Sequence, residues 1–320
     1  MATGKQVSRD VFPYLRVYDD GTIERLAGTE VTPAGLDSKT GVLSKDIVII
    51  PETNVSARLY RPDSAKGSQK LPVMVYFHGG AFCIASTAEP KYQNCLNMLV
   101  SEANIFVVSV DYRLVPEHPL DVVYQDSWDA LQWLASHANE KGGNEPWLQD
   151  YADFDQLFLA GDSAGANIAH HMALRLNNSK PTRTLLKIRG IAMIHPYFWG
   201  KNPIGVEVED SLRKPMVDNW WTFVCPSEKG CDDPLINPFV DGAPGLNDLA
   251  CDSVLVFIAE KDILRSRGKL YYDGLIKSGW KGKAEIVETK GEDHVFHIFD
   301  ADCENARVLI KRWASFVNQK

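Results

Sequence analysis

The fold is decided by the stretch Leu157-Phe158-Leu159-Ala160-Gly161-Asp162-Ser163-Ala164-Gly165-Ala166-Asn167. An apolar run long enough for a buried strand comes first, and the pattern Gly-x-Ser-x-Gly follows it directly. Small residues suited to the start of a helix come next. In such a tight strand-to-helix turn the serine Oγ is pushed out of the backbone. The turn also places the serine at a helix N-terminus, where N–H groups favour developing negative charge. Ser163 is therefore the candidate nucleophile.

Apolar runs rich in β-branched and aromatic residues recur around this turn. They lie at 73–77, 105–110, 157–160, 191–194, 254–258 and 284–287. Helical patterns separate most of them, at 124–137, 164–176, 270–278 and 303–317. Alternating strands and helices predict parallel βαβ units with both faces of the sheet covered. Before these units we expect two antiparallel strands, at 46–50 and 55–60. The second is expected to be an edge strand with one face exposed to solvent.

Two segments do not follow this alternation of strands and helices. Residues 1–45 form a polar, turn-rich lead-in, and residues 198–250 carry six prolines together with Trp199, Trp220 and Trp221. A long insertion between two core strands is typical of a cap over an active site. The alternative is a surface excursion with a small core of its own.

The length, composition and net charge of the chain limit the classes of protein to which it can belong. The 320 residues suit one large α/β domain, 1–320, with 45% hydrophobic content and a net charge of −8. No basic run stands out, so nucleic acid is a poor partner. No eighteen apolar residues occur together, and the polar start suggests no signal peptide. The six cysteines lack ligand spacing, which favours reduced thiols in the cytoplasm.

The loop Phe77-His78-Gly79-Gly80-Ala81-Phe82 directly follows the predicted strand 73–77. Two glycines after a strand let backbone N–H groups turn inward, which is the geometry that binds an oxyanion. We expect the donors to be the amides of Gly79, Gly80 and Ala164, the last being the residue after the nucleophile. An ordinary glycine turn is the alternative.

A serine hydroxyl is barely ionised at neutral pH and needs a base and an orienting acid. Asp262 follows the strand 254–258, and His294 lies in a loop after the strand 284–287, so both are expected at the carboxyl edge of the sheet. Glu260 and His297 compete with them, but Glu260 is nearer its strand and His297 suits packing on a helix. Ser163, Asp262 and His294 are the predicted triad.

This chemistry requires no metal and no organic cofactor. His170 and His171 are adjacent on a helix and face different directions, so they cannot share a metal ion. His195 is interpreted as an ordinary core or surface histidine. Asp162 is interpreted as a hydrogen-bonding brace of the turn.

These residues together resemble the plant carboxylesterases, a group of hormone-sensitive-lipase-like α/β-hydrolases that also includes gibberellin receptors. The resemblance rests on Val75-Tyr76-Phe77-His78-Gly79-Gly80-Ala81-Phe82, Ser109-Val110-Asp111-Tyr112-Arg113-Leu114, Pro116-Glu117-His118-Pro119-Leu120, Tyr151-Ala152-Asp153-Phe154, Gly161-Asp162-Ser163-Ala164-Gly165-Ala166-Asn167 and Ala259-Glu260-Lys261-Asp262. It implies the α/β-hydrolase fold, with a mostly parallel central sheet flanked by helices. It also implies a cap built from 1–45 and 198–250, a cytoplasmic location and hydrolysis of small carboxylic esters.

Three functions stay open at this stage. The first is a serine carboxylesterase of plant specialised metabolism, in which loss of CO2 can follow ester cleavage. The second is a dehydratase or alkaloid cyclase on the same scaffold, although such relatives often change the nucleophile, the oxyanion loop or the histidine. The third is a non-catalytic, hormone-type receptor, which the presence of His294 argues against. Oligomeric state is open between monomer and homodimer.

The expected partner is a small, fairly apolar ester. Residues near the presumed pocket predict its contacts, although the aromatic ones fit the core of the cap equally well. They are Ala81, Phe82, Ile84, Trp220, Trp221 and Val295. The chain departs from the family pattern at Ala81, where a third glycine is usual, and at residues 121–123, where Pro-Ala-Ala is usual. The second departure is expected to alter a loop beside the pocket.

Overall fold

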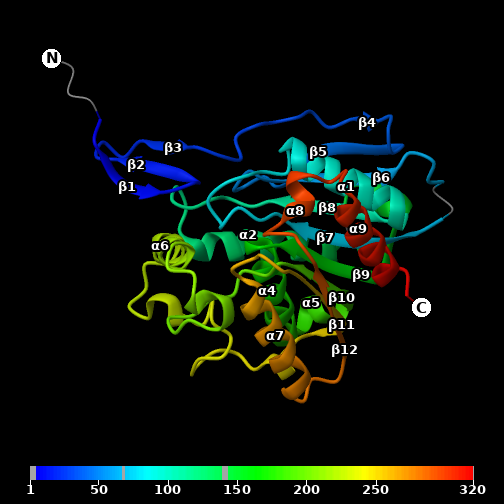
Figure 1. The fold of residues 1–320 in the computed structure, drawn as a ribbon. Helices are drawn as coiled ribbons and strands as arrows, with labels where there is room; N and C mark the ends of the chain where they lie inside the picture. The colour runs from blue at the N-terminus through cyan, green and yellow to red at the C-terminus, as the bar shows by residue number, and fades with distance from the viewer. Residues whose placement is uncertain (1–4, 67–68, 139–142, 320) are drawn as a thin grey trace.

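The computed structural model describes residues 5–66, 69–138 and 143–319, and these form two β-sheets (Figure 1). The larger sheet has the strand order β12-β11-β10-β9-β7-β8-β6-β5-β4, and the smaller has the order β1-β2-β3. The strands are β1 Val7–Val11, β2 Leu15–Tyr18, β3 Ile23–Arg25, β4 Leu36–Asp37, β5 Val42–Ile50, β6 Val55–Pro62, β7 Leu71–Phe77, β8 Phe106–Asp111, β9 Ala152–Asp162, β10 Ile188–Ile194, β11 Cys251–Ala259 and β12 Lys283–Thr289.

Helices occupy the connections from β7 onward. They are α1 Pro90–Ala103, α2 Leu120–His137, α3 Pro146–Tyr151, α4 Ala164–Asn178, α5 Lys180–Leu185, α6 Arg213–Val224, α7 Arg265–Lys277, α8 Phe296–Phe299 and α9 Glu304–Val317, with the 3-10 turns η1 Gly205–Val208, η2 Gly230–Asp232 and η3 Leu246–Asp248. Strands β7 to β12 pair in parallel, whereas β4, β5 and β6 extend the sheet in antiparallel fashion beyond β8. The mostly parallel sheet of an α/β-hydrolase fold is therefore confirmed.

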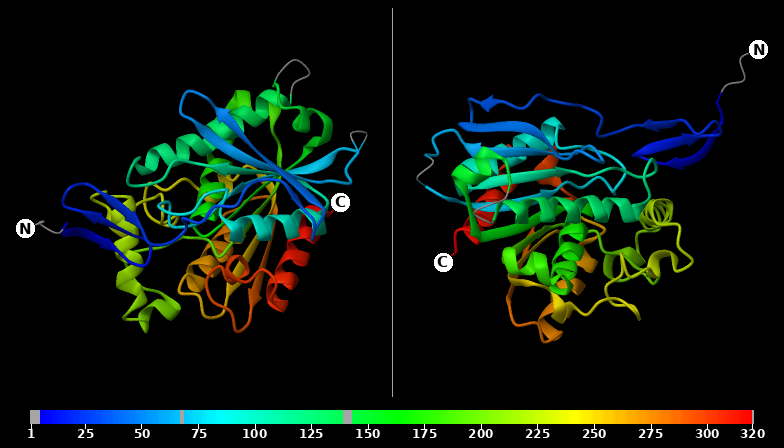
Figure 2. Two further views of the ribbon diagram at one scale, coloured as in Figure 1. Left: turned by 90° about the horizontal axis from the view of Figure 1, so that it is seen from above. Right: turned by 180° about the vertical axis from the view of Figure 1, so that it is seen from behind.

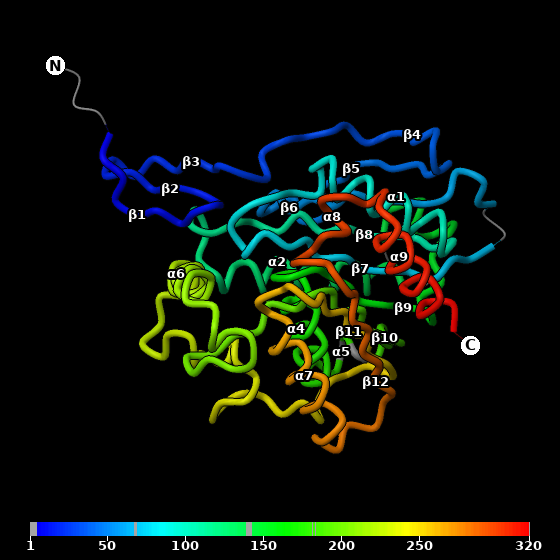
Figure 3. The backbone as a smooth tube through the Cα atoms, in the orientation of Figure 1, coloured from blue at the N-terminus to red at the C-terminus, as the bar shows by residue number. Residues whose placement is uncertain are grey.

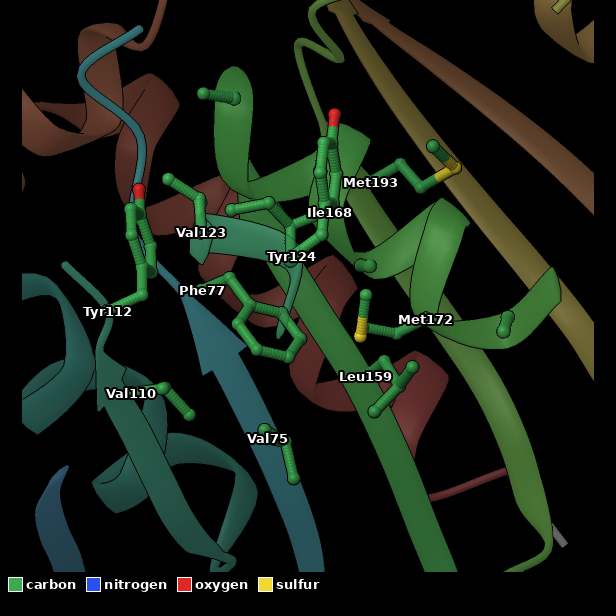
Figure 4. Packing of buried hydrophobic residues seen from close by; sticks show 14 of the residues in the cluster. Val75, Phe77, Val110, Tyr112, Val123, Tyr124, Leu159, Ile168, Met172 and Met193 are labelled. Atoms are coloured by element: carbon green, nitrogen blue, oxygen red, sulfur yellow. The ribbon is translucent and has the colours of Figure 1, made fainter. Parts of the chain in front are cut away.

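Helices cover both faces of the large sheet. On one face, α2 and α4 pack against inward side chains of β7 and β9, as Figure 4 shows for Val75, Phe77 and Leu159 beneath Ile168 and Met172. On the other face, α1 and α9 enclose the alternate residues of the same strands. Two buried faces explain why these strands read as unbroken apolar runs.

The antiparallel region corrects two expectations. Strand β6 is not an edge strand, because it lies between β5 and β8 and is mostly buried; the alternating exposure occurs in β5. Residues 1–45 are more than a lead-in, because they contain β1, β2, β3 and β4. A turn after Tyr18 joins β2 to β3.

The small sheet lies beside α6 of the insertion (Figure 2). Trp220 Nε1 donates a hydrogen bond to the carbonyl of Phe12 at 2.8 Å, and Asn219 Nδ2 donates to the carbonyl of Asp10 at 3.1 Å. The rings of Tyr14 and Trp220 lie 4.8 Å apart. The insertion can be followed from the end of β10 through α6 to the start of β11 in Figure 3. Two segments about two hundred residues apart thus meet on one side of the molecule.

Two bulk expectations can be compared with the structure. Within the described residues, no helix combines the length and the apolar character that crossing a membrane requires. All six cysteines fall in the described part of the chain, and each is a free thiol.

A buried ion pair attaches the insertion to α7. Arg267 donates to both carboxylate oxygens of Glu207 at 2.7 Å and to the carbonyl of Asn202 at 2.6 Å, and both charged side chains are at least nine-tenths buried. Removing one partner of such a pair leaves an uncompensated buried charge, which costs about 3–5 kcal/mol.

We expect Arg267→Met to lower the free energy of unfolding by about 3–5 kcal/mol in urea titrations, because Glu207 would lose its partner. The control is Arg189→Met, whose pair with Asp252 is solvent-exposed and contributes about 1 kcal/mol or less. Equal losses in the two variants would contradict this assignment.

Candidate active site

Ser163 occupies the turn between β9 and α4 with a positive φ of 51°. A non-glycine residue in such a conformation costs about 1–3 kcal/mol and persists only where its surroundings enforce it. Two glycines allow the enforcing contacts. A Cβ added to Gly161 would lie 2.3 Å from the carbonyl carbon of Gly165, and a Cβ on Gly165 would lie 1.8 Å from the carbonyl oxygen of Phe77. The strand-turn-helix geometry expected around Ser163 is present.

A continuous hydrogen-bond chain joins Ser163, His294 and Asp262. His294 Nε2 lies 2.9 Å from Ser163 Oγ, and His294 Nδ1 lies 2.7 Å from Asp262 Oδ2. The other oxygen of Asp262 accepts the backbone N–H of Leu264 at 2.8 Å, which fixes the carboxylate. All three side chains follow the carboxyl ends of parallel strands, β9, β11 and β12. The structure brings together the three residues that the sequence singled out.

The two competing residues lie elsewhere. Glu260 accepts the backbone N–H of Gly291 at 2.8 Å and pairs with Lys290 near the surface. His297 is fully buried in α8, where its ring packs 5.7 Å from that of His195. Neither residue takes part in the hydrogen-bond chain to Ser163.

The charges around His294 favour its protonated form. Burial alone would lower the pKa of His294, but the hydrogen-bonded carboxylate of Asp262 raises it, and Asp162 and Asp293 act in the same direction. The pKa of His294 therefore lies above the ordinary value of 6.5. An imidazolium formed when His294 takes the proton of Ser163 is stabilised by these carboxylates.

The loop after β7 corrects the expected set of oxyanion donors. The amide of Gly79 is engaged, because it donates to Asp162 Oδ1 at 3.0 Å. By contrast, the amides of Gly80, Ala81 and Ala164 meet no acceptor within the described residues. The alanine in place of a third glycine still offers its backbone N–H. The donor set that the geometry leaves available is Gly80, Ala81 and Ala164, without Gly79.

Asp162 ties this loop to the nucleophile turn. Its fully buried carboxylate accepts hydrogen bonds from Tyr76 Oη at 2.6 Å, Tyr92 Oη at 3.1 Å and the Gly79 amide. Burial raises the pKa of Asp162, while the hydrogen bonds from Tyr76 and Tyr92 act against that rise. The bracing role expected for Asp162 matches these contacts.

His195 is a residue of the site that the sequence analysis treated as an ordinary histidine. It follows β10 directly, and its Nδ1 accepts the backbone N–H of Val295 at 2.7 Å. The backbone N–H of His195 donates to the carbonyl of Phe257 at 3.0 Å. His195 thereby anchors the loop that carries His294. Its position at the carboxyl end of a predicted strand was the signal that could have found it.

His195, Asp262 and His294 also place ligand-type atoms within 4.8 Å of one another. However, both ring nitrogens of His294 are already hydrogen-bonded to Ser163 and Asp262. The ring of His195 in turn is bonded through Nδ1 to the backbone N–H of Val295, and we assign no metal or cofactor to the group.

A cavity of about 570 Å³ has Ser163 and His294 in its wall. Four of the expected substrate contacts also line it, namely Ala81, Ile84, Trp220 and Val295. The N-terminal segment also lines the cavity, through Pro13, Tyr14, Ala27 and Gly28. The wall contains a few charged side chains, which are Glu89, Lys91, Asp162, Arg213 and Asp293.

The other expected contacts are corrected. Phe82 and Trp221 are fully buried, do not line this cavity, and pack against each other with ring centres 6.3 Å apart. Large aromatic side chains beside a tight loop fill the core in preference to facing a solvent-filled space. The unusual residues 121–123 lie in the first turn of helix α2, not in a loop, and do not line the cavity either.

Comparisons with known proteins agree with this geometry. The sequence pattern of a family described as the alpha/beta hydrolase fold matches residues 74–298. A probable carboxylesterase 2 of Arabidopsis thaliana is 59% identical over 99% of this chain and 98% of its own length. A 2-hydroxyisoflavanone dehydratase of Glycyrrhiza echinata is 45% identical over 98% of this chain and 97% of its own length. The solved structure of a hyperthermophilic esterase from Pyrobaculum calidifontis is similar with a TM-score of 0.70 and 28% identity, over 86% of this chain and 84% of that one.

The effect of the nearby charges on the pKa of His294 can be tested by titration. NMR of the histidine rings is expected to place the pKa of His294 above 6.5, because nearby carboxylates outweigh burial. Asp262→Asn removes the hydrogen-bonded charge but keeps the burial, so we expect the pKa of His294 to fall. Asp293→Asn is the control, since Asp293 is more than half exposed and its effect is screened. A larger fall in the control would contradict this account.

Proposed function

Because the chain belongs to the plant carboxylesterase family of α/β-hydrolases, we propose that it is a serine carboxylesterase that cleaves a small, fairly apolar ester through an acyl-enzyme. The observation that carries the proposal is the hydrogen-bond chain from Ser163 through His294 to Asp262 at the wall of the cavity. This arrangement can make a serine hydroxyl nucleophilic at neutral pH.

In the first half of the reaction, His294 Nε2 takes the proton of Ser163 as Oγ attacks the ester carbonyl carbon. The carbonyl oxygen becomes an oxyanion, which the amides of Gly80, Ala81 and Ala164 are free to bind. The C–O bond then breaks, and His294 returns the proton to the departing alcohol. In the second half, water gives a proton to His294 as its oxygen attacks the acyl carbon. The bond between that carbon and Ser163 Oγ then breaks, His294 returns the proton to Oγ, and the acid leaves.

Each oxyanion donor of this kind typically contributes a factor of about 10²–10³ to the rate. The bonds of Gly79 to Asp162 hold the loop in place before substrate arrives. The loop is therefore preorganised, and little reorganisation accompanies the development of negative charge.

A dehydratase is the second candidate, because a relative of that activity is 45% identical over nearly the whole chain. The same pocket would bind a ketone oxygen at the free amides while His294 removes a proton from the carbon beside the ketone. The hydroxyl on the next carbon would then leave as water, taking that proton back from His294. Such a reaction does not need Ser163 as a nucleophile. We find no observation that favours the receptor alternative over these two, since the triad is complete and hydrogen-bonded.

The proposal also covers the domain organisation, the cellular location and the partners of the protein. We infer one domain, 1–320, in which residues 1–45 and 198–250 form a cap. The contacts of Trp220 and Asn219 with the N-terminal segment support this division. A cytoplasmic location is supported by the six free thiols. We propose no nucleic-acid partner, and a monomer or a homodimer fits the proposal.

We expect wild-type protein to hydrolyse p-nitrophenyl butanoate, and Ser163→Ala and His294→Ala each to lower kcat by a factor of about 10⁴ or more. Spectrophotometric turnover measures this directly. Wild-type turnover no faster than that of Ser163→Ala would remove the esterase proposal. Dehydration of a 2-hydroxyisoflavanone by Ser163→Ala but not by His294→Ala would favour the second candidate.

A further inference from the structure

One acid in the wall of the cavity takes no part in the triad or its bracing. Glu89 immediately precedes helix α1, and it lines the same cavity as Ser163. The nearby wall is apolar on the sides formed by Ile298 and Phe299 of helix α8. A carboxyl group in such surroundings needs a physical explanation, because burying a charge is costly unless it is paired and hydrogen-bonded.

The contacts of Glu89 within the described residues do not supply that compensation. Its side chain is 8% exposed, yet its carboxylate accepts no hydrogen bond, not even from the N-terminus of the helix it precedes. Its ion-pair partner, Lys91, lies 3.9 Å away, which is the outer limit of such a pair. Tyr92 Oη, which also lines the cavity, is already bonded to Asp162 and Gly79. Glu89 is therefore a largely enclosed side chain whose carboxylate has no hydrogen-bond partner among the described residues.

The charge around Glu89 indicates what kind of partner fits. The ammonium of Lys91 lies over the ring of Phe299 at 5.2 Å and partly balances a carboxylate at Glu89. Burial raises the pKa of Glu89 by more than Lys91 lowers it, and the charges of Asp162 and Glu30 add to the rise. A carboxyl that already has a cation nearby gains little from a second cation. It gains more from a hydroxyl, which both donates and accepts hydrogen bonds.

We propose that Glu89 forms a polar subsite of the cavity that binds a hydroxyl group of the substrate, so that the preferred ester is apolar near the reacting carbonyl and carries a hydroxyl on its acyl or alcohol part. This proposal rests on the esterase function and names a substrate class for it. Because the hydroxyl satisfies a buried carboxyl, an ester with a methyl group in its place leaves that carboxyl unpaired and is disfavoured.

The test compares matched ester pairs, each member differing only by a hydroxyl in place of a methyl group. In the acyl arm the pair is p-nitrophenyl 6-hydroxyhexanoate and p-nitrophenyl heptanoate. In the alcohol arm it is the mono-butanoate of 1,4-butanediol and pentyl butanoate, followed by acid release. We expect the ratio of kcat/KM for the hydroxyl ester to that for the methyl ester to fall about 10- to 100-fold in Glu89→Leu in at least one arm. A ratio taken on one preparation is insensitive to the fraction of folded protein.

Two further variants separate binding from a general charge effect. Glu89→Gln keeps a group that donates and accepts hydrogen bonds and is expected to retain most of the preference. Glu30→Gln is the matched control, because Glu30 is exposed and outside the cavity yet acts electrostatically on Glu89. This variant is expected to leave the ratio unchanged.

An unchanged ratio in both arms for Glu89→Leu would overturn the proposal while leaving the esterase function intact. A preference for p-nitrophenyl 6-aminohexanoate that disappears in Glu89→Leu, with unchanged hydroxyl ratios, would also overturn it, because Glu89 would then select a cation. If wild-type protein hydrolyses p-nitrophenyl butanoate but neither member of any pair, the subsite proposal fails alone. If it hydrolyses none of these esters, the esterase function fails as well.

Discussion

The close approach of helix α4 to the end of β7 is the constraint on which the active site depends. A Cβ on Gly165 would lie 1.8 Å from the carbonyl oxygen of Phe77, so a side chain of any size at this position would force the helix and the strand apart. Phe77 is the last residue of β7, and the oxyanion loop begins directly after it. The distance between the loop and Ser163 is thus set by backbone contact, which is stiffer than contact between side chains.

A second interaction fixes the orientation of the loop once it is near. The buried carboxylate of Asp162 binds the amide of Gly79 and two tyrosine hydroxyls, so one residue of the loop is held and the following amides stay free. His195 does the same for the loop of the general base through the amide of Val295. The catalytic groups therefore stand on a backbone framework whose positions are set before substrate binds, which is the arrangement that electrostatic catalysis requires.

The sequence predicted what depends on local pattern and failed where the answer depends on distant contacts. The parallel strands and the three residues Ser163, Asp262 and His294 were accessible because each lies beside a recognisable apolar run. The small sheet β1–β3 was missed because its strands are short and largely exposed, and they pack on α6 some two hundred residues away. Gly79 was misjudged because its amide is engaged by a carboxylate that only the fold brings near. The burial of Glu89 has no sequence signal, because a glutamate before a proline-initiated helix is normally solvent-exposed.

The cavity is lined by parts of the chain that have different roles. Ser163 and His294 line it from the turns that follow strands of the large sheet, whereas another part of its wall comes from the N-terminal segment and the insertion, which contact each other through Trp220. Substrate range is thereby separated from chemistry, because residues of the wall can change without moving the reacting groups. Glu89 belongs to neither segment and introduces a polar contact from the helix beside the oxyanion loop.

The central claim, that Ser163 is the nucleophile of an acyl-transfer reaction, is tested most directly by covalent labelling with a p-nitrophenyl alkylphosphonate, followed by peptide mass spectrometry. This reagent reacts with a serine activated by a neighbouring base and gives a stable adduct that resembles the tetrahedral intermediate. The account predicts stoichiometric release of nitrophenolate and a single modified peptide with the phosphonyl group on Ser163. A protein that hydrolyses esters but is labelled at another residue, or is not labelled at all, would contradict the account.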